Sequence, residues 1–170
     1  MVEEQIDWRK TVEAILENAN RPFVPISKSF IQQPRGSKER SSVLSQFVTN
    51  GELRGLKAYL LIAASASSPD TDNEWYTSLP LQTWARAFGC SETAGSVATA
   101  KAAATRILLR LQQRGLIEKS RCGKERKIKI KLLAQDGSGE EYQRPASRYI
   151  RLSHDFWKSR FDEEDRKSVV

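Results

Sequence analysis

The chain has 170 residues, with 28 basic and 21 acidic side chains, and its formal net charge of +7 favours a polyanionic partner. It contains no run of about 18 apolar residues and no basic-then-apolar start, so we expect neither a membrane-spanning helix nor a secretory leader. Its two cysteines form no metal-type pair, and we therefore expect a cytoplasmic, nucleoid-associated protein with reduced thiols.

The first segments flank the main part of the chain. Trp8, Val12, Ile15 and Leu16 recur at helical spacing and predict an amphipathic helix over residues 6–19, which either packs on the core or pairs with a second copy. Residues 23–31 predict a strand at a sheet edge, because Pro25 lacks a backbone donor. Residues 32–42 are polar and basic, and we interpret them as a linker or as an arm along a DNA backbone.

Two helices with a strand between them are predicted next. Asn50 is a candidate N-cap for a scaffold helix over residues 51–65. The expected buried stripe of that helix is Leu53, Leu56, Leu60, Ala63 and Ala64. After an acidic loop at residues 67–74 and a strand at 75–79, Pro80 suits the first turn of a second helix. Trp84 and Phe88 belong to the apolar face of that helix, and Gly89 ends it.

Residues 96–133 form the central unit of the sequence, a long helix followed by a hairpin. Apolar residues recur on one helical face: Val97, Ala100, Ala104, Ile107, Leu108 and Leu111. Ser96 is the expected N-cap, and Gly115 follows the last periodic residue as a helix stop. Beyond Gly115 the period changes to two, since Ile128 and Ile130 alternate with lysines, and residues 122–125 supply the turn.

The last part of the chain contains a loop at residues 137–139 and a predicted strand over residues 148–152. The pattern from Tyr149 to Trp157 repeats that from Phe23 to Ile31. Either both segments line equivalent sheet edges, which we favour, or a second domain copy begins at Tyr149. His154 is the only histidine, and we expect it on the surface of a strand-to-helix turn.

Charge is concentrated in the central unit. Residues 99–131 carry eleven Lys or Arg and two acids, a net charge of +9, so the remaining 137 residues sum to −2. A basic region on one helix and hairpin is typical of a nucleic-acid site. A merely solvated face would leave the slight acidity of the rest of the chain unexplained.

Several residues of this unit match a known family. Leu108, Leu111, Gly115, Leu116 and Ile117 follow the pattern of a recognition helix that leads into a wing hairpin. Upstream, Ala85 and Gly89 resemble the preceding helix and turn. Over residues 50–134 the chain therefore resembles the winged helix-turn-helix DNA-binding family. The stretch between Gly89 and Gly115 is longer than usual, so residues 91–96 form either an insertion or an early helical turn.

The resemblance implies an α+β, mostly helical fold with a three-helix core and a small antiparallel sheet. We divide the chain into an N-terminal helix (1–22), an edge segment and basic linker (23–48), a winged helix domain (49–135) and a C-terminal strand and charged tail (136–170). The expected function is sequence-specific binding of double-stranded DNA in transcriptional regulation, with a homodimer left open. Replication initiation or partition of a plasmid or phage, and a protein-interaction module, are the alternatives.

The expected contacts follow from the two surfaces of the central unit. The base-reading candidates lie on the N-terminal half of the helix, opposite its apolar stripe: Thr99, Lys101, Ala102, Thr105 and Arg106. Arg110 is expected to meet phosphate or to support the fold. The backbone-contacting candidates lie on the hairpin: Arg121, Lys124, Arg126 and Lys127.

The sequence shows no pattern typical of catalysis. We find no Ser-His-Asp arrangement, metal-ligand cluster or phosphate-binding glycine loop, and expect no enzymatic activity, cofactor, metal or small-molecule ligand.

Overall fold

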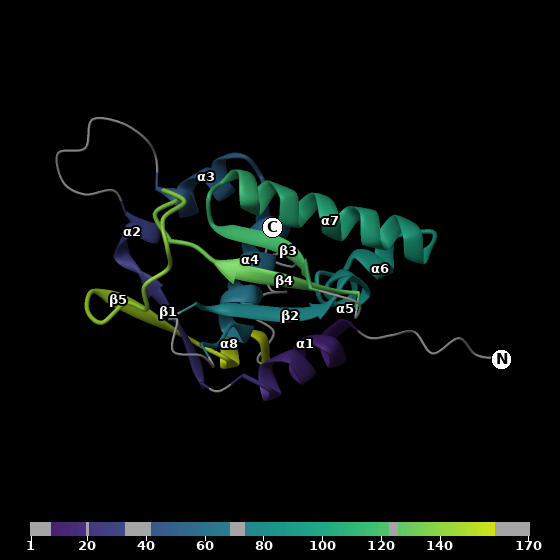
Figure 1. Cartoon of the computed structure of the whole chain (residues 1–170), viewed down its shortest axis with the longest axis horizontal. Coiled ribbons are helices and arrows are strands. Elements are labelled where there is room, and N and C mark those ends of the chain that lie inside the picture. Colours follow the sequence, from purple (N-terminus) through teal and green to yellow (C-terminus); the bar gives the residue numbers. More distant parts are fainter. Residues whose placement is uncertain (1–7, 20, 33–41, 69–73, 123–125, 159–170) are drawn as a thin grey trace, which may run out of the picture.

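A computed structural model of the chain describes residues 8–19, 21–32, 42–68, 74–122 and 126–158, and it is an α+β fold with small antiparallel sheets (Figure 1). The elements in chain order are α1 (Trp8–Glu17), β1 (Phe23–Ser27), α2 (Lys28–Ile31), α3 (Val43–Thr49), α4 (Leu53–Ser65), β2 (Tyr76–Pro80), α5 (Leu81–Ala87), α6 (Cys90–Thr93), α7 (Val97–Gln113), β3 (Ile117–Cys122), β4 (Lys127–Leu132), β5 (Tyr149–Ser153) and α8 (Asp155–Lys158). Within these ranges no helix has the length and apolar character needed to cross a bilayer.

The strands form a three-stranded sheet in the order β2–β4–β3 and a separate two-stranded sheet of β1 and β5. β4 is the central strand, with Lys129 opposite Ser78 of β2 and Ser120 of β3. Since successive side chains of a strand point to opposite faces, the burial of Ile130 and Leu132 puts the lysines of β4 on the outer face. In Figure 1, β3 lies beside α7 and β2 lies on the side of α1.

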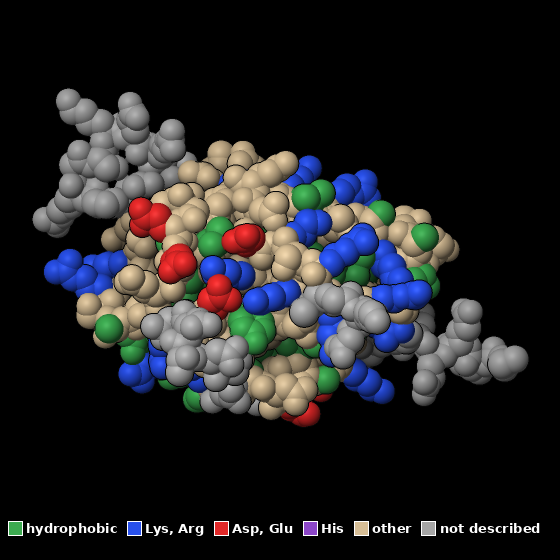
Figure 2. Space-filling model, viewed as in Figure 1, with side chains coloured by type: hydrophobic (Ala, Val, Ile, Leu, Met, Phe, Trp, Pro, Cys, Tyr) green, Lys and Arg blue, Asp and Glu red, His purple; other side chains and the backbone are tan. Residues whose placement is uncertain are grey.

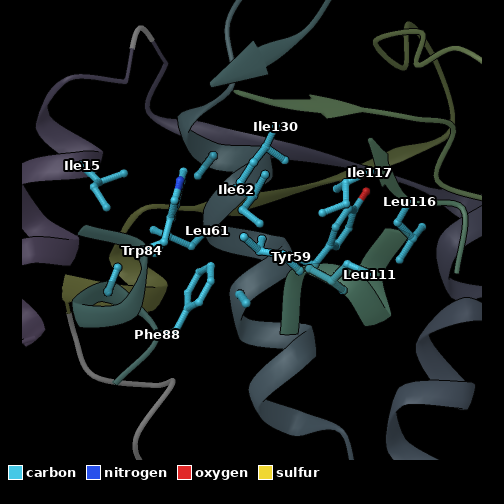
Figure 3. Packing of buried hydrophobic residues seen from close by; sticks show 14 of the residues in the cluster. Ile15, Tyr59, Leu61, Ile62, Trp84, Phe88, Leu111, Leu116, Ile117 and Ile130 are labelled. Atoms are coloured by element: carbon cyan, nitrogen blue, oxygen red, sulfur yellow. The ribbon is translucent and has the colours of Figure 1, made fainter. Parts of the chain in front are cut away.

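The core lies between α4, α5, α7 and the inner face of the three-stranded sheet (Figure 3). Trp84 stacks on Phe88 with ring centroids 5.5 Å apart, and Tyr59 stacks on Phe30 at 5.4 Å. The largest fully buried side chains are Trp84, Tyr59, Phe30, Phe47, Ile62, Leu108, Leu111, Leu116, Ile117, Ile130, Leu132 and Val24. Each such side chain contributes about 1.5–3 kcal/mol on burial, so the cluster fixes α7 and the hairpin as one body.

The predicted boundaries of α7 are confirmed. The Ser96 hydroxyl accepts a hydrogen bond from the Thr99 amide at 3.2 Å, as expected of an N-cap. Gly115 follows the helix with a φ of +72°. A Cβ at Gly115 would lie 2.6 Å from the Gly137 carbonyl oxygen, so the corner between α7 and β3 requires glycine for both conformation and space.

The predicted start of the scaffold helix, at residue 51 with Asn50 as the N-cap, is wrong. Asn50 does not cap that helix but is the C-cap of α3, which crosses the predicted boundary at residues 48/49 and was not predicted. α4 begins at Leu53, with Glu52 at the N-cap position and no side-chain cap bond.

The buried stripe of α4 is also corrected. Its buried residues are Ala58, Tyr59, Leu61, Ile62 and Ala64. Leu53 is exposed, and Leu56, Leu60 and Ala63 are only half-buried. The physical reason is that α4 is surrounded by α1, α3, α7, β1 and β2, so tertiary neighbours and not a single stripe decide which residues are buried.

Two smaller predictions are wrong in position. Pro80 is the last residue of β2 and the N-cap of α5, one residue before the helix begins. His154 is buried and not on the surface, because its ring packs edge-on against Trp157 at 6.1 Å between β5 and α8.

The flanking elements α1 and β1 pack against α4, and α1 also packs against α5. α1 buries Val12, Ile15 and Leu16 and contacts α5, α4 and α8, so its apolar face meets the core of its own chain. β1 and β5, the two segments with similar sequences, pair antiparallel and form the two edges of one sheet. Each precedes a short helix, and Ser27 and Ser153 each accept a hydrogen bond from the amide two residues later.

Candidate nucleic-acid interface

The face of α7 opposite the core is uncovered. Thr99, Ala102 and Arg106 are exposed along it, and Lys101 and Thr105 are half-buried at its edge. Its other exposed residues include Ala98 and Gln113. The structure therefore brings Thr99, Ala102 and Arg106 together on the uncovered face, whereas Lys101 and Thr105 lie on one flank of the helix, between this face and the core.

Hydrogen bonds within α7 limit what its threonines can offer. The Thr99 hydroxyl lies 2.9 Å from the Ser96 hydroxyl, and the Thr105 hydroxyl donates to the Lys101 carbonyl oxygen at 2.9 Å. With its proton engaged, Thr105 can only accept a further hydrogen bond, and its methyl group remains available for apolar contact. Arg106 is therefore the predicted residue best suited to donate to a base edge.

A further cation lies beside this face and was not predicted. Arg54, on the first turn of α4, is exposed, and its charge and that of Arg106 both act on Cys90 at the start of α6. Burial raises the pKa of the Cys90 thiol, and the two arginines oppose that rise. In the sequence, Arg54 stands out only as a basic residue outside the apolar stripe of the predicted scaffold helix, so nothing local indicates that it lies near α7.

The arginines at the C-terminal end of α7 are held by an acid. Arg114 donates from Nε and Nη2 to Glu52 Oε2 at 3.1 and 2.7 Å, and from Nη1 to Gln46 at 3.1 Å. Arg110 Nη1 lies 3.9 Å from Glu52 Oε1, although 68% of the Arg110 side chain is exposed. Arg114 thus joins α7 to α3 and α4, whereas Arg110 meets Glu52 only at 3.9 Å and stays largely exposed.

The hairpin is fixed in orientation relative to α7. The Lys119 amide donates to Gln112 Oε1 at 3.0 Å, and Leu133 N donates to Leu116 O at 2.9 Å across the base of the hairpin. Of the predicted backbone contacts, Arg121 and Arg126 are exposed, Lys127 is half-buried, and Lys124 lies outside the described residues. The hairpin that bears these side chains is thus joined by hydrogen bonds to α7, whose uncovered face holds base-reading candidates.

The lysines farther along β4 are partly neutralised. Lys129 and Lys131 lie 3.4 and 3.3 Å from the two carboxylate oxygens of Glu74, and Lys129 sits over the Tyr76 ring at 4.4 Å. The hydrogen bond and charge of Lys131, followed by those of Lys129, lower the pKa of Glu74. The net charge counted along the sequence therefore overstates the charge available to a ligand.

Figure 2 shows the resulting distribution on one face of the molecule. Many Lys and Arg side chains gather on the right of the view, over α7 and the β3–β4 hairpin. Most of the visible Asp and Glu side chains lie to the left of its centre. We call the uncovered face of α7 together with the hairpin cations the α7–hairpin surface. It is defined by Thr99, Lys101, Ala102, Thr105, Arg106, Arg121 and Arg126, with Arg54 beside it. The predicted backbone contact Lys127 lies instead with Lys129 and Lys131 on the outer face of the sheet.

No family model, curated protein or solved structure matches this chain. Among the described residues no group of three or more His, Cys, Asp or Glu is placed to hold a metal ion.

Proposed function

We propose that α4, α5 and α7 with the β2–β4–β3 sheet form a winged helix domain that binds double-stranded DNA in a sequence-specific manner, as a transcriptional regulator. The order α4–β2–α5–α7–β3–β4 supports this reading, because it supplies three helices and a three-stranded antiparallel sheet ending in a hairpin. α6, over Cys90–Thr93, is an extra helical turn that accounts for the long spacing between Gly89 and Gly115.

The observation that carries the proposal is the uncovered, small-residue face of α7, with the exposed cations Arg106, Arg121 and Arg126 on it and beside it. The major groove admits one α-helix, and Ala102 and Thr99 let the helix axis approach base edges closely. Arg106 then reaches a base, with guanine as the preferred acceptor. Arg121 and Arg126 on the hairpin meet phosphates on the adjacent backbone.

The first experiment is selection of bound duplexes from a random pool, followed by footprinting. We expect one recurrent sequence, and a two-fold symmetric footprint would indicate a homodimer. Sites in promoters would support transcriptional regulation, whereas iterated sites at an origin would support replication initiation. Absence of duplex binding even at low salt would contradict the proposal and favour a protein-interaction module.

A matched pair of variants tests whether α7 enters the groove. Ala102→Glu places a carboxylate on the exposed face of α7, where it would repel phosphate, and should abolish binding of the selected duplex. Ala14→Glu makes the same change at an exposed position of α1 and should leave binding unchanged. Both variants should remain folded, because glutamate is a good helix former at exposed positions. Equal affinities for the two variants would contradict the role of α7.

A further inference from the structure

The β1–β5 sheet carries arginine and aromatic side chains on one face. The register places Pro25 opposite Arg151, so Phe23, Tyr149 and Arg151 share a face. The Arg151 guanidinium lies 5.0 Å from the Phe23 ring centroid and 6.0 Å from that of Tyr149. Arg151 is exposed, and both rings are half-buried, so this group is open to a ligand.

A cleft continues this face toward the three-stranded sheet. It has a volume of about 340 Å³, and Phe23 lines it together with Arg21, Trp75 and Tyr142. Arg21 stacks on the Trp75 ring at 4.1 Å, and Trp75 meets Tyr142 edge-on at 5.9 Å. Since Phe23 belongs to both groups, the sheet face and the cleft form one surface.

The cations of this surface come from two segments without acids, which are bounded in the sequence by Glu17, Glu141 and Asp155. Residues 18–32 and 142–154 contain five basic residues and no Asp or Glu: Arg21, Lys28, Arg144, Arg148 and Arg151. Within the described part of the chain, none of these five takes part in an ion pair. Burial and the nearby charge of Arg144 lower the pKa of Arg21, which shows that the fold brings like charges close together.

We propose that this arginine–aromatic face, made by Arg21, Phe23, Trp75, Tyr142, Tyr149 and Arg151, binds single-stranded nucleic acid. Sites for single strands combine cations that follow the backbone with rings and guanidinium planes on which unpaired bases stack. The cleft is in the size range of small-ligand pockets, so a single base can enter it. A duplex keeps its bases stacked inside the helix and offers these rings no partner.

The proposal is tested by fluorescence anisotropy with a labelled oligothymidylate of about 16 nucleotides. Tyr149→Leu keeps apolar bulk but removes the ring, and should weaken binding about tenfold. Arg151→Gln removes a charge and a stacking plane at an exposed position and should weaken binding at least as much. Lys10→Gln, an exposed cation on α1, is the matched control and should bind like wild type.

Two comparisons make the result decisive. Polyphosphate offers charge without bases, so it should compete much less well than oligothymidylate at equal phosphate concentration. Equal competition, or wild-type affinity in both Tyr149→Leu and Arg151→Gln, would overturn the proposal. Binding of the selected duplex, measured on the same proteins, should be unchanged by Tyr149→Leu and abolished by Ala102→Glu. Failure of the single-strand site is therefore distinguishable from failure of the duplex site.

Discussion

Two basic surfaces of this molecule differ in what lies between their cations. On the α7–hairpin surface, Arg106 stands among alanine and threonine on a rigid helix. On the arginine–aromatic face, Arg21 and Arg151 are interleaved with Trp75, Phe23 and Tyr149. A helix with small side chains fits the major groove of a duplex, whereas aromatic side chains bind bases whose faces are exposed in a single strand. Charge alone therefore does not indicate which ligand each surface binds. The side chains beside each cation indicate it.

The largest expected contrast between the surfaces is in salt dependence. If the α7–hairpin surface neutralises about six phosphates, duplex affinity should fall about a thousandfold between about 50 and about 200 mM salt. The two arginines of the arginine–aromatic face should cost only about sevenfold on a single strand over the same range, because fewer counterions are released and single strands condense fewer. Titrations of both ligands at several salt concentrations measure the two slopes, and identical slopes would contradict the assignment of separate sites.

A second prediction concerns the corner at which α7 meets the loop leading to β5. Gly115→Ala should lower the free energy of unfolding by about 3 kcal/mol, because a Cβ there meets Gly137 O at 2.6 Å and Gly139 N at 3.1 Å in addition to the cost of a positive φ. Gly139→Ala shares the positive φ, at +79°, but meets nothing within 4 Å, and should cost about 1 kcal/mol. Urea denaturation measures both, and equal losses would show that the close approach at Gly115 is not a stability determinant.

The central unit was predictable because its signals are local. Ser96, the apolar stripe through Leu108 and Leu111, and Gly115 lie within a few residues of the backbone groups they control, so periodicity and capping located α7. The lysine–isoleucine alternation located β4 for the same reason. α3 also had a local signal, the Ser42 cap with Val43 and Phe47 one turn apart, but its polar surroundings favoured a linker.

What was not predictable depends on contacts between distant segments. Glu52 neutralises Arg114, and Glu74 neutralises Lys129 and Lys131, and no property of these acids in the sequence indicates their partners. The arginine–aromatic face is a stronger example, because it requires Arg21 and Trp75 to meet although three helices, α2, α3 and α4, lie between them in the sequence. Similarity between the β1 and β5 segments was visible, but their pairing with each other was not.

A third prediction separates base reading from backbone contact on the α7–hairpin surface. Arg106→Ala should weaken the selected duplex by about tenfold to a hundredfold and relax its sequence preference, since a bidentate contact to a base discriminates by about 1–3 kcal/mol. Arg126→Ala should weaken selected and scrambled duplexes similarly and reduce the salt slope by about one. Anisotropy titrations with both duplexes measure the difference, and equal losses on the two sequences for Arg106→Ala would contradict base reading.

The smallest expected effect comes from the outer face of the sheet, and it defines where the α7–hairpin surface ends. Glu74→Gln removes the carboxylate that Lys129 and Lys131 share, and leaves Lys131 with only Glu141 at 3.9 Å. Duplex affinity and its salt slope should still stay unchanged, because the burial of Ile130 and Leu132 puts these lysines on the outer face of the sheet. A steeper slope in the variant would instead show that the outer face of β4 contacts DNA.

The same variant tests how Glu74 contributes to stability at different pH values. Because the folded pKa of Glu74 is lowered, the stabilising effect of this carboxylate is present above the ordinary pKa of 4.5 and is lost as the pH falls through the folded pKa. Thermal melts of Glu74→Gln and wild type should therefore differ slightly near neutral pH and converge in acid, whereas a difference that persists in acid would assign Glu74 a role other than charge.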